Sequence, residues 1–238
     1  MYDIVYISYK EDIPSKKYIN DIVMKFPYNK THWVRGVKGI HNAHKEAASR
    51  VLSKMFYVVD ADADLLPHFK FDIKLDPSEE DIVHVWRSIN PVNGLEYGFG
   101  GVKLLPTELT RNMSIDSVDM TTSISPRFKI MPEISNITAF NTDPLSTWRS
   151  AFRECVKLSS RIIPGQDNSQ SEQRLTAWIN FGGNEAFGEY SKGGASAGQW
   201  YGTTYKDDPE ALSKINDYDW LEEQFNAHIE LFPPETFK

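Results

Sequence analysis

The chain has 238 residues, of which 40% are hydrophobic and 25% are charged, and its formal net charge is −7. Six Trp, eleven Tyr and thirteen Phe exclude a disordered chain, because burying such side chains offsets the entropy cost of ordering. No apolar stretch approaches the roughly 20 residues that span a bilayer, and the first residues become acidic too early for a signal peptide. We therefore expect a cytoplasmic protein with no membrane partner. Cys155 is the only cysteine, which excludes an intrachain disulfide.

The charge is unevenly distributed along the chain. Residues 1–54 contain ten Lys and Arg but only five Asp and Glu, a net of +5, so the remainder carries −12. A basic segment raises the local concentration of anions and predicts a phosphate-bearing ligand, with Lys10 and Lys38 as candidate phosphate contacts. A solvated helix surface would explain the same charges. The acidic total argues against tight non-specific binding to duplex nucleic acid.

The first sixty residues alternate between strand and helix patterns. Periodicity and capping residues predict five elements in order: strand 3–8, helix 14–26, strand 32–36, helix 41–55 and strand 56–59. This alternation predicts an α/β, Rossmann-like domain with a mostly parallel sheet and helices on both faces. Ligands of such sheets bind beyond the carboxyl ends of the strands, so the loops after Ser8, Gly36 and Val59 are expected to share one crevice.

The rest of the chain adds further elements without a repeat or a linker. The patterns predict strands at 82–90, 102–105 and 134–140, and helices at 144–160, 171–181 and 218–231. Asp143 is placed to cap the helix that begins at Pro144. Residues 182–202 hold seven of the fourteen glycines, and 193–198 are expected to form a phosphate-wrapping loop or a flexible lid. We predict a single domain, 1–238, with halves at 1–105 and 106–238.

Acidic residues follow the third predicted strand directly. The segment is Asp60-Ala61-Asp62-Ala63-Asp64, and hard divalent cations such as Mn²⁺ or Mg²⁺ prefer carboxylate oxygens. Acids on a loop at a strand end can hold a cation that also binds donor phosphates. Asp217 and Asp219 have the same spacing but suit a helix cap. We therefore predict that the metal ligands come from Asp60, Asp62 and Asp64. The alternative is that these residues only form a turn and cap.

At this point the sequence resembles a family. GIHNAHKEAASRVLSKMFYVVDADADL resembles the part of GT-A-fold glycosyltransferases in which a helix and an apolar strand lead to a D-x-D motif. YGFGGV at 97–102 resembles the glycine pair beside their acceptor site. The resemblance covers roughly residues 3–105 and implies that Asp60 lies near the donor ribose and the metal. It implies Asp62 as the main metal ligand, while Asp64 is extra to the motif and leaves the register open.

The resemblance also implies further contacts to the donor and separate binding regions for donor and acceptor. The donor would be a UDP-sugar bound by residues 1–105, with the acceptor bound by 106–238. Tyr9 is a candidate to stack on the uracil ring. His44 is a candidate phosphate contact, with plain polar packing as the alternative. Gly100 and Gly101 form the glycine pair. As an aromatic residue after a strand, Tyr9 would equally suit the core.

The second half of the chain resembles glycosyltransferases of tailed phages. The segments that carry this resemblance are FNTDPLSTWRSAFRECVKL, FGEYSKGGASAG and INDYDWL. Members of that group glycosylate modified DNA bases, so the resemblance implies DNA with a hydroxymethylated or hydroxylated cytosine as a partner. It would place the protein in the host cytoplasm. A saccharide or glycan acceptor is the alternative.

Two carboxylates are candidates for the catalytic base. Asp143 lies at a helix N-terminus, where inverting enzymes of this fold often place the group that deprotonates the acceptor, although its capping role explains it equally well. Glu185 lies among glycines that would allow a substrate to approach closely.

Two other classes of protein stay open as alternatives. A nucleotidyltransferase would normally carry a glycine-rich loop after the first strand, which YKEDIPS lacks, and a non-catalytic binding module would show no donor turnover.

Overall fold

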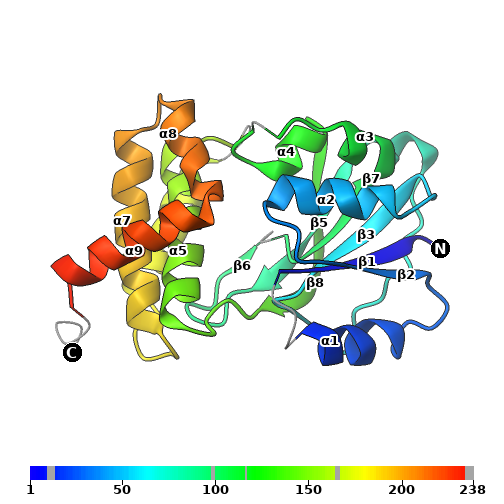
Figure 1. Ribbon diagram of the computed structural model, residues 1–238, viewed down its shortest axis with the longest axis horizontal. Helices are drawn as coiled ribbons and strands as arrows, with labels where there is room; N and C mark the ends of the chain where they lie inside the picture. Colours follow the sequence, from blue (N-terminus) through cyan, green and yellow to red (C-terminus); the bar gives the residue numbers. More distant parts are fainter. Residues whose placement is uncertain (10–13, 98–99, 116, 164–166, 234–238) are drawn as a thin grey trace. The chain divides into compact units, whose positions relative to one another are not determined.

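The computed structural model describes residues 1–9, 14–97, 100–115, 117–163 and 167–233. These residues form two compact units (Figure 1). The first contains Met1–Ile89 and Glu96–Thr138, and the second contains Asn90–Leu95 and Ala139–Lys238. None of the helices in the described part of the chain has the length and apolar composition needed to cross a membrane.

A mixed sheet organises the first unit. Its strand order is β2-β1-β3-β7-β5-β8-β4, with β6 paired to β5. The strands are β1 (Asp3–Ser8), β2 (Thr31–Arg35), β3 (Met55–Asp60), β4 (Ala63–Leu65), β5 (Val83–Ile89), β6 (Glu96–Tyr97), β7 (Val102–Pro106) and β8 (Phe128–Thr138). The β1–β2, β1–β3 and β5–β8 ladders are parallel, and the other ladders among the described residues are antiparallel. The predicted α/β class is confirmed. The sheet is mixed rather than mostly parallel, because β7 runs against β3 and against β5.

Helices cover both faces of this sheet (Figure 1). They are α1 (Pro14–Lys17), η1 (Tyr18–Val23), α2 (Ile40–Ser49), η2 (Pro77–Glu79), α3 (Thr107–Asn112) and α4 (Met120–Ile124). Side chains alternate along a strand, so β3 contributes to two cores. Phe56 and Val58 pack with α2 and α4, whereas Tyr57 and Val59 pack with Ile22 of η1 on the other face.

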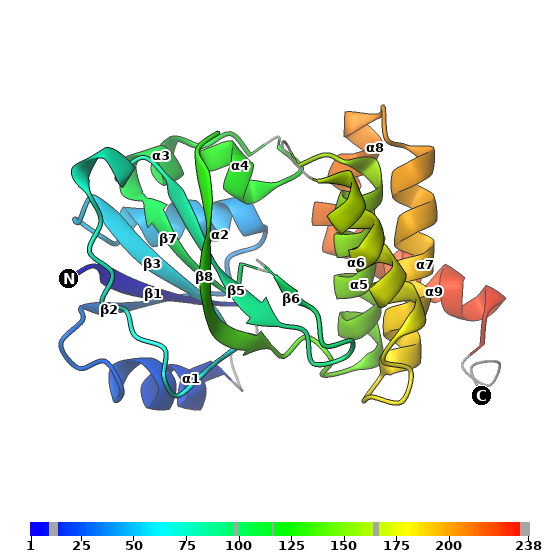
Figure 2. The same cartoon turned by 180° about the vertical axis from the view of Figure 1, so that it is seen from behind.

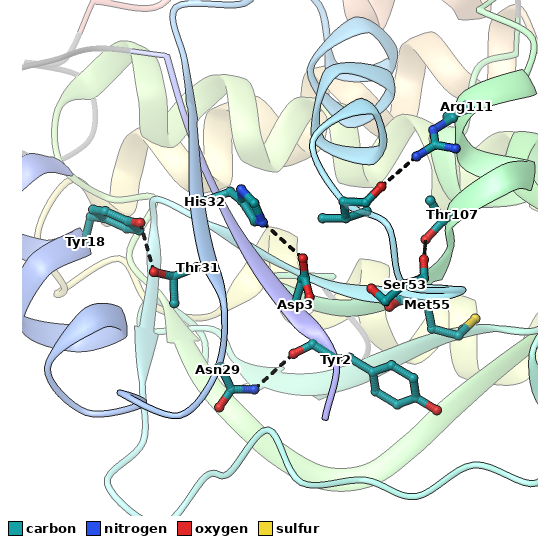
Figure 3. Close-up of polar contacts among 11 residues, drawn as sticks. Tyr2, Asp3, Tyr18, Asn29, Thr31, His32, Ser53, Met55, Thr107 and Arg111 are labelled. Atoms are coloured by element: carbon teal, nitrogen blue, oxygen red, sulfur yellow. Dashed lines mark hydrogen bonds and ion pairs between the residues drawn. The ribbon is translucent and has the colours of Figure 1, made fainter.

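Contacts between distant segments fix the ends of these elements. The predicted helix 41–55 ends at Ser49, because Arg111 of α3 donates hydrogen bonds to the carbonyl oxygens of Ala48 at 3.0 Å and Val51 at 2.7 Å. These bonds satisfy carbonyls that a longer helix would have used. Figure 3 shows Arg111 and Thr107 of α3 reaching the segment between α2 and β3, where Thr107 Oγ1 donates to the carbonyl oxygen of Ser53 at 2.6 Å.

Polar contacts also hold β1 beside β2 (Figure 3). His32 Nε2 and Asp3 Oδ2 lie 3.1 Å apart, and Asn29 Nδ2 donates to the carbonyl oxygen of Tyr2 at 3.0 Å. Together with the parallel ladder, in which Ser8 lies opposite Arg35, these contacts bring the carboxyl ends of both strands to the same edge of the sheet.

Helices make up most of the second unit (Figure 2). They are α5 (Pro144–Ser160), α6 (Asn168–Asn180), α7 (Gly188–Thr204), α8 (Pro209–Ser213), η3 (Lys214–Asn216) and α9 (Tyr218–Leu231). The helices predicted at 144–160 and 218–231 are confirmed, with Asp143 and Asp217 as their caps. The core of this unit is aromatic, and Trp148 stacks on Phe152 with ring centroids 4.8 Å apart.

The prediction that 193–198 forms a phosphate loop or lid is wrong, because these residues lie inside α7. Each glycine inside a helix costs about 1 kcal/mol relative to alanine, but here the missing side chains let α7 approach α5 closely. A Cβ atom would lie 2.3 Å from Trp148 O at Gly194, 2.4 Å from Phe152 O at Gly198 and 2.6 Å from Val156 O at Gly202. The glycines therefore form a packing row, one per helical turn.

This row predicts a position-dependent response to alanine. We expect Gly198→Ala to lower the free energy of unfolding by about 1–3 kcal/mol, because the new methyl group meets backbone that can move only with the helix. Gly193→Ala is the matched control: its methyl group would meet only the Nε2 end of the His228 side chain. Chemical denaturation measures both variants, and equal stabilities would contradict the packing explanation.

Candidate functional site

The carboxyl ends of three parallel strands meet at one edge of the sheet. Ser8 of β1 pairs with Arg35 of β2, and Ile7 pairs with Asp60 of β3. The backbone N–H of Ala61 donates to Ile7 O at 2.9 Å, which holds the chain beyond β3 against β1. Tyr9, 55% exposed, follows β1 at this edge. The fold thus brings together the strand ends from which the sequence predicted a ligand site.

Asp60 forms an ion pair with a buried lysine. Lys103 Nζ lies 2.7 Å from Asp60 Oδ2, and the two side chains are 5% and 31% exposed. Alternation along β3 and β7 explains the pairing, because Asp60 points to the same face as Val58 and Lys103 to the same face as Leu105. The Lys103 ammonium therefore holds the Asp60 carboxylate on its buried side, while the rest of the carboxylate faces solvent.

The glycine pair supports this ion pair through its backbone. Gly101 O accepts a hydrogen bond from Asp60 N at 2.9 Å, and a Cβ on Gly101 would lie 2.7 Å from the Asn136 side-chain amide. Gly100 has a φ of +80°, and a Cβ there would lie 3.1 Å from Cε of Lys103. Both positions therefore require glycine for reasons of geometry beside Asp60.

Asp62 lies in a negative local field. It is exposed at the surface, yet the surrounding protein partly removes its water, and this raises the pKa of its carboxyl to about 6. The negative charge of Asp60 is the second cause, and Lys103 and Lys17 act in the opposite direction. The charged form of Asp62 is thus disfavoured as the site stands, so a bound cation would stabilise it.

Asp64 is engaged elsewhere. Its Oδ1 lies 2.5 Å from Lys17 Nζ, and that ammonium also donates to Ala61 O at 2.9 Å. Lys17 belongs to α1, on the face of the sheet opposite α2. Within the described ranges, no group of three His, Cys, Asp or Glu side chains is arranged to hold a metal. Asp60 and Asp62 both carry a carboxylate at the end of β3, the ligand type that Mg²⁺ and Mn²⁺ prefer, and their role as metal ligands stays a prediction.

His44 is buried beside this site and uncharged. It is 2% exposed, its Nδ1 lies 2.8 Å from Ile40 O, and its Nε2 has no hydrogen-bond partner among the described residues. Burial, followed by the charge of Lys103, lowers the pKa of His44 to about 4. The predicted phosphate contact therefore cannot come from a charged imidazole at neutral pH.

Much of the basic N-terminal charge is already paired within the protein. Lys25 pairs with Asp21, Arg50 with Glu46 and Lys54 with Glu80. Lys38 is exposed between β2 and α2, at the predicted site edge, and Lys10 lies outside the described residues. Of the predicted positive contacts, Lys38 is the one that the described structure places at the strand ends.

The two candidate bases belong to the second unit. Asp143 caps α5, because its Oδ1 accepts a hydrogen bond from Ser146 N at 2.8 Å. Glu185 is exposed in the turn before α7, and Asn141 Nδ2 donates to Ala186 O at 3.4 Å. That bond places the segment before α5 beside the turn that carries Glu185. The cap accounts for Asp143, and the catalytic role of either residue stays a prediction.

Lys103 is the site residue that sequence reasoning missed. Its signal was a single charged residue in the otherwise apolar strand sequence VKLLP, two positions after the glycine pair. A lysine at a strand position whose neighbours are buried needs a buried partner. The partner, Asp60, is 43 residues away in sequence and becomes visible only when β7 is placed beside β3.

Comparisons with known proteins place this chain in no family. No family model and no curated protein sequence matches it. Among solved structures, HddC from Yersinia pseudotuberculosis is similar over 56% of this chain and 90% of that chain, with 14% identity and a TM-score of 0.33. A score this low supports no argument about function.

The buried ion pair gives a prediction about stability. We expect Lys103→Met to lower the free energy of unfolding by about 1–3 kcal/mol, because it leaves the Asp60 carboxylate without its cation. Lys54→Met is the control, since that lysine pairs with Glu80 at the surface and is 77% exposed. Urea denaturation should show no measurable loss for the control. An equal response of both variants would contradict the buried role.

Proposed function

We propose that this protein is a glycosyltransferase that binds a nucleotide-sugar donor at the carboxyl ends of β1, β2 and β3. The observation that carries the proposal is the Asp60–Asp62 pair at the end of β3, in a local field that favours a cation despite two lysines nearby. A UDP-sugar is the proposed donor, and Mn²⁺ or Mg²⁺ is the proposed ion.

The residues at this edge have distinct roles in the proposed reaction. A divalent cation bound by Asp60 and Asp62 would stabilise the negative charge of the departing diphosphate. Lys103 keeps the Asp60 carboxylate in place, and Lys38 is proposed to contact the donor phosphates. Tyr9, exposed beyond β1, offers a ring face to the uracil base. Asp143 or Glu185, or the leaving phosphate, would accept the proton of the acceptor hydroxyl.

Donor hydrolysis is the direct test of this proposal. The protein is incubated with a panel of UDP-sugars, with and without Mn²⁺, and release of UDP is followed by chromatography. Slow, metal-dependent hydrolysis of one donor supports the proposal. Binding of UDP without any turnover would indicate a binding module, and release of pyrophosphate from a nucleoside triphosphate would indicate a nucleotidyltransferase.

Substitutions of the acids separate their roles. We expect Asp62→Asn to abolish turnover and to weaken Mn²⁺-dependent UDP binding in calorimetry, while the thermal midpoint of the metal-free protein stays nearly unchanged. Asp64→Asn is the matched control, because Asp64 pairs with Lys17 rather than with Asp60 and Asp62. Full activity of the Asp62 variant would remove Asp62 from the metal site.

The acceptor is the least constrained part of the proposal. A hydroxymethylated cytosine in phage DNA follows from the sequence resemblance. Against it, the second unit carries fifteen Asp and Glu but only nine Lys and Arg, which opposes contact with a polyanion.

A transfer assay identifies the acceptor. Labelled donors are offered with hydroxymethylcytosine DNA, unmodified DNA and saccharides. If DNA is the acceptor, label enters only the modified duplex and transfer falls steeply with salt. Label entering only saccharides ends the DNA hypothesis.

A further inference from the structure

A second candidate site lies within the helical unit. A cavity with a volume of 470 Å³ opens between the end of α7, α8, η3 and α9. This volume falls in the range of roughly 300–1,000 Å³ that is typical of small-molecule sites. All of its lining residues belong to the same compact unit, so its shape does not depend on how the two units are placed.

Three aromatic rings line this cavity, and Tyr201 contacts both of the others. The centroids of Tyr201 and Tyr205 are 4.6 Å apart, and those of Tyr201 and Trp220 are 5.4 Å apart. Tyr201 is anchored, because its hydroxyl donates to Ala211 O at 2.9 Å. Tyr201 is buried, so Tyr205 and Trp220, which are half-exposed, provide most of this aromatic wall. The wall therefore suits the face of a flat or ring-shaped ligand.

Hydrogen-bond acceptors and a hydrogen-bond donor complete the lining of the cavity. Asp208 and Glu210 supply carboxylates, and Lys214 supplies an ammonium donor. Asp208 Oδ1 also accepts a hydrogen bond from Ala211 N at 3.0 Å, which fixes that carboxylate at the start of α8. Carboxylates accept hydrogen bonds from hydroxyl groups, and the lysine can donate to a ring or hydroxyl oxygen. The two acids outnumber the lysine, so a phosphorylated ligand would be repelled.

We propose that this cavity, defined by Tyr201, Tyr205, Asp208, Glu210, Lys214 and Trp220, binds a neutral saccharide. A sugar ring has an apolar face of C–H groups that can lie on the aromatic wall, and its rim of hydroxyls matches the carboxylates and the ammonium. A nucleobase in DNA would share the flat face but would bring phosphates toward two acids. The site stands on its own residues and does not depend on the proposed donor site.

Saturation-transfer NMR tests the proposal directly. Methyl glycosides of glucose, galactose and mannose, together with maltose and lactose, are titrated into the wild-type protein without nucleotide or metal. We expect at least one of them to bind. Tyr205→Ala is expected to weaken that binding about tenfold, because it removes part of the apolar wall. Glu210→Gln is expected to weaken it severalfold with no change in fold, since Glu210 is exposed.

Matched controls make each outcome decisive. Phe181 is 57% exposed and does not line the cavity, so Phe181→Ala should bind the saccharide as the wild type does. Failure of every saccharide to bind would overturn the proposal. So would binding that both cavity variants leave unchanged, or binding of cytidine or choline in place of saccharides at this site. Since no donor or metal is present, none of these results bears on the glycosyltransferase proposal.

Discussion

A lysine ammonium that is only 5% exposed is costly to bury unless a carboxylate meets it, and Lys103 meets Asp60 at 2.7 Å. Several features of the site depend on that contact. It requires β7 to run beside β3, so that both side chains reach the face covered by α2. It requires little bulk at Gly100, whose neighbour is the Lys103 side chain. The lysine charge also helps to keep His44 neutral and moderates the negative field at Asp62.

The sequence predicts well the features that short-range patterns encode. Apolar runs placed β1, β2 and β3, and the Asp-Pro step placed the start of α5 at Pro144, because strand alternation and helix capping are local. The βαβ alternation also placed the ends of these strands at one edge, which is why Asp60 was a candidate site residue. Lys103 stood out as a charge in an apolar strand, but its partner could not be predicted, because the antiparallel placement of β7 between β3 and β5 depends on long-range pairing.

The glycine-rich helix α7 is a case in which local sequence patterns gave the wrong secondary structure. By local propensity, three glycines in nine residues of a helix favour a loop, and a loop was predicted. The helix forms because Gly194, Gly198 and Gly202 repeat every four residues and face the backbone of α5. Close packing between the two helices offsets the unfavourable propensity of these glycines. A four-residue glycine repeat is a signal in itself, but it acquires meaning only when a partner helix such as α5 is recognised.

The charges of the two units differ in a way that bears on any acceptor. The first unit, with seventeen Lys and Arg and eighteen Asp and Glu, is almost neutral, and it contains Lys38 at the proposed donor edge. The second unit has nine basic and fifteen acidic residues, and its aromatic cavity is itself acidic. The net negative charge of the second unit would repel a polyanion but not a neutral saccharide. Sugar hydroxyls are also good hydrogen-bond donors to carboxylates. Charge and cavity chemistry therefore favour the same class of ligand, although one is a property of the whole unit and the other of six side chains.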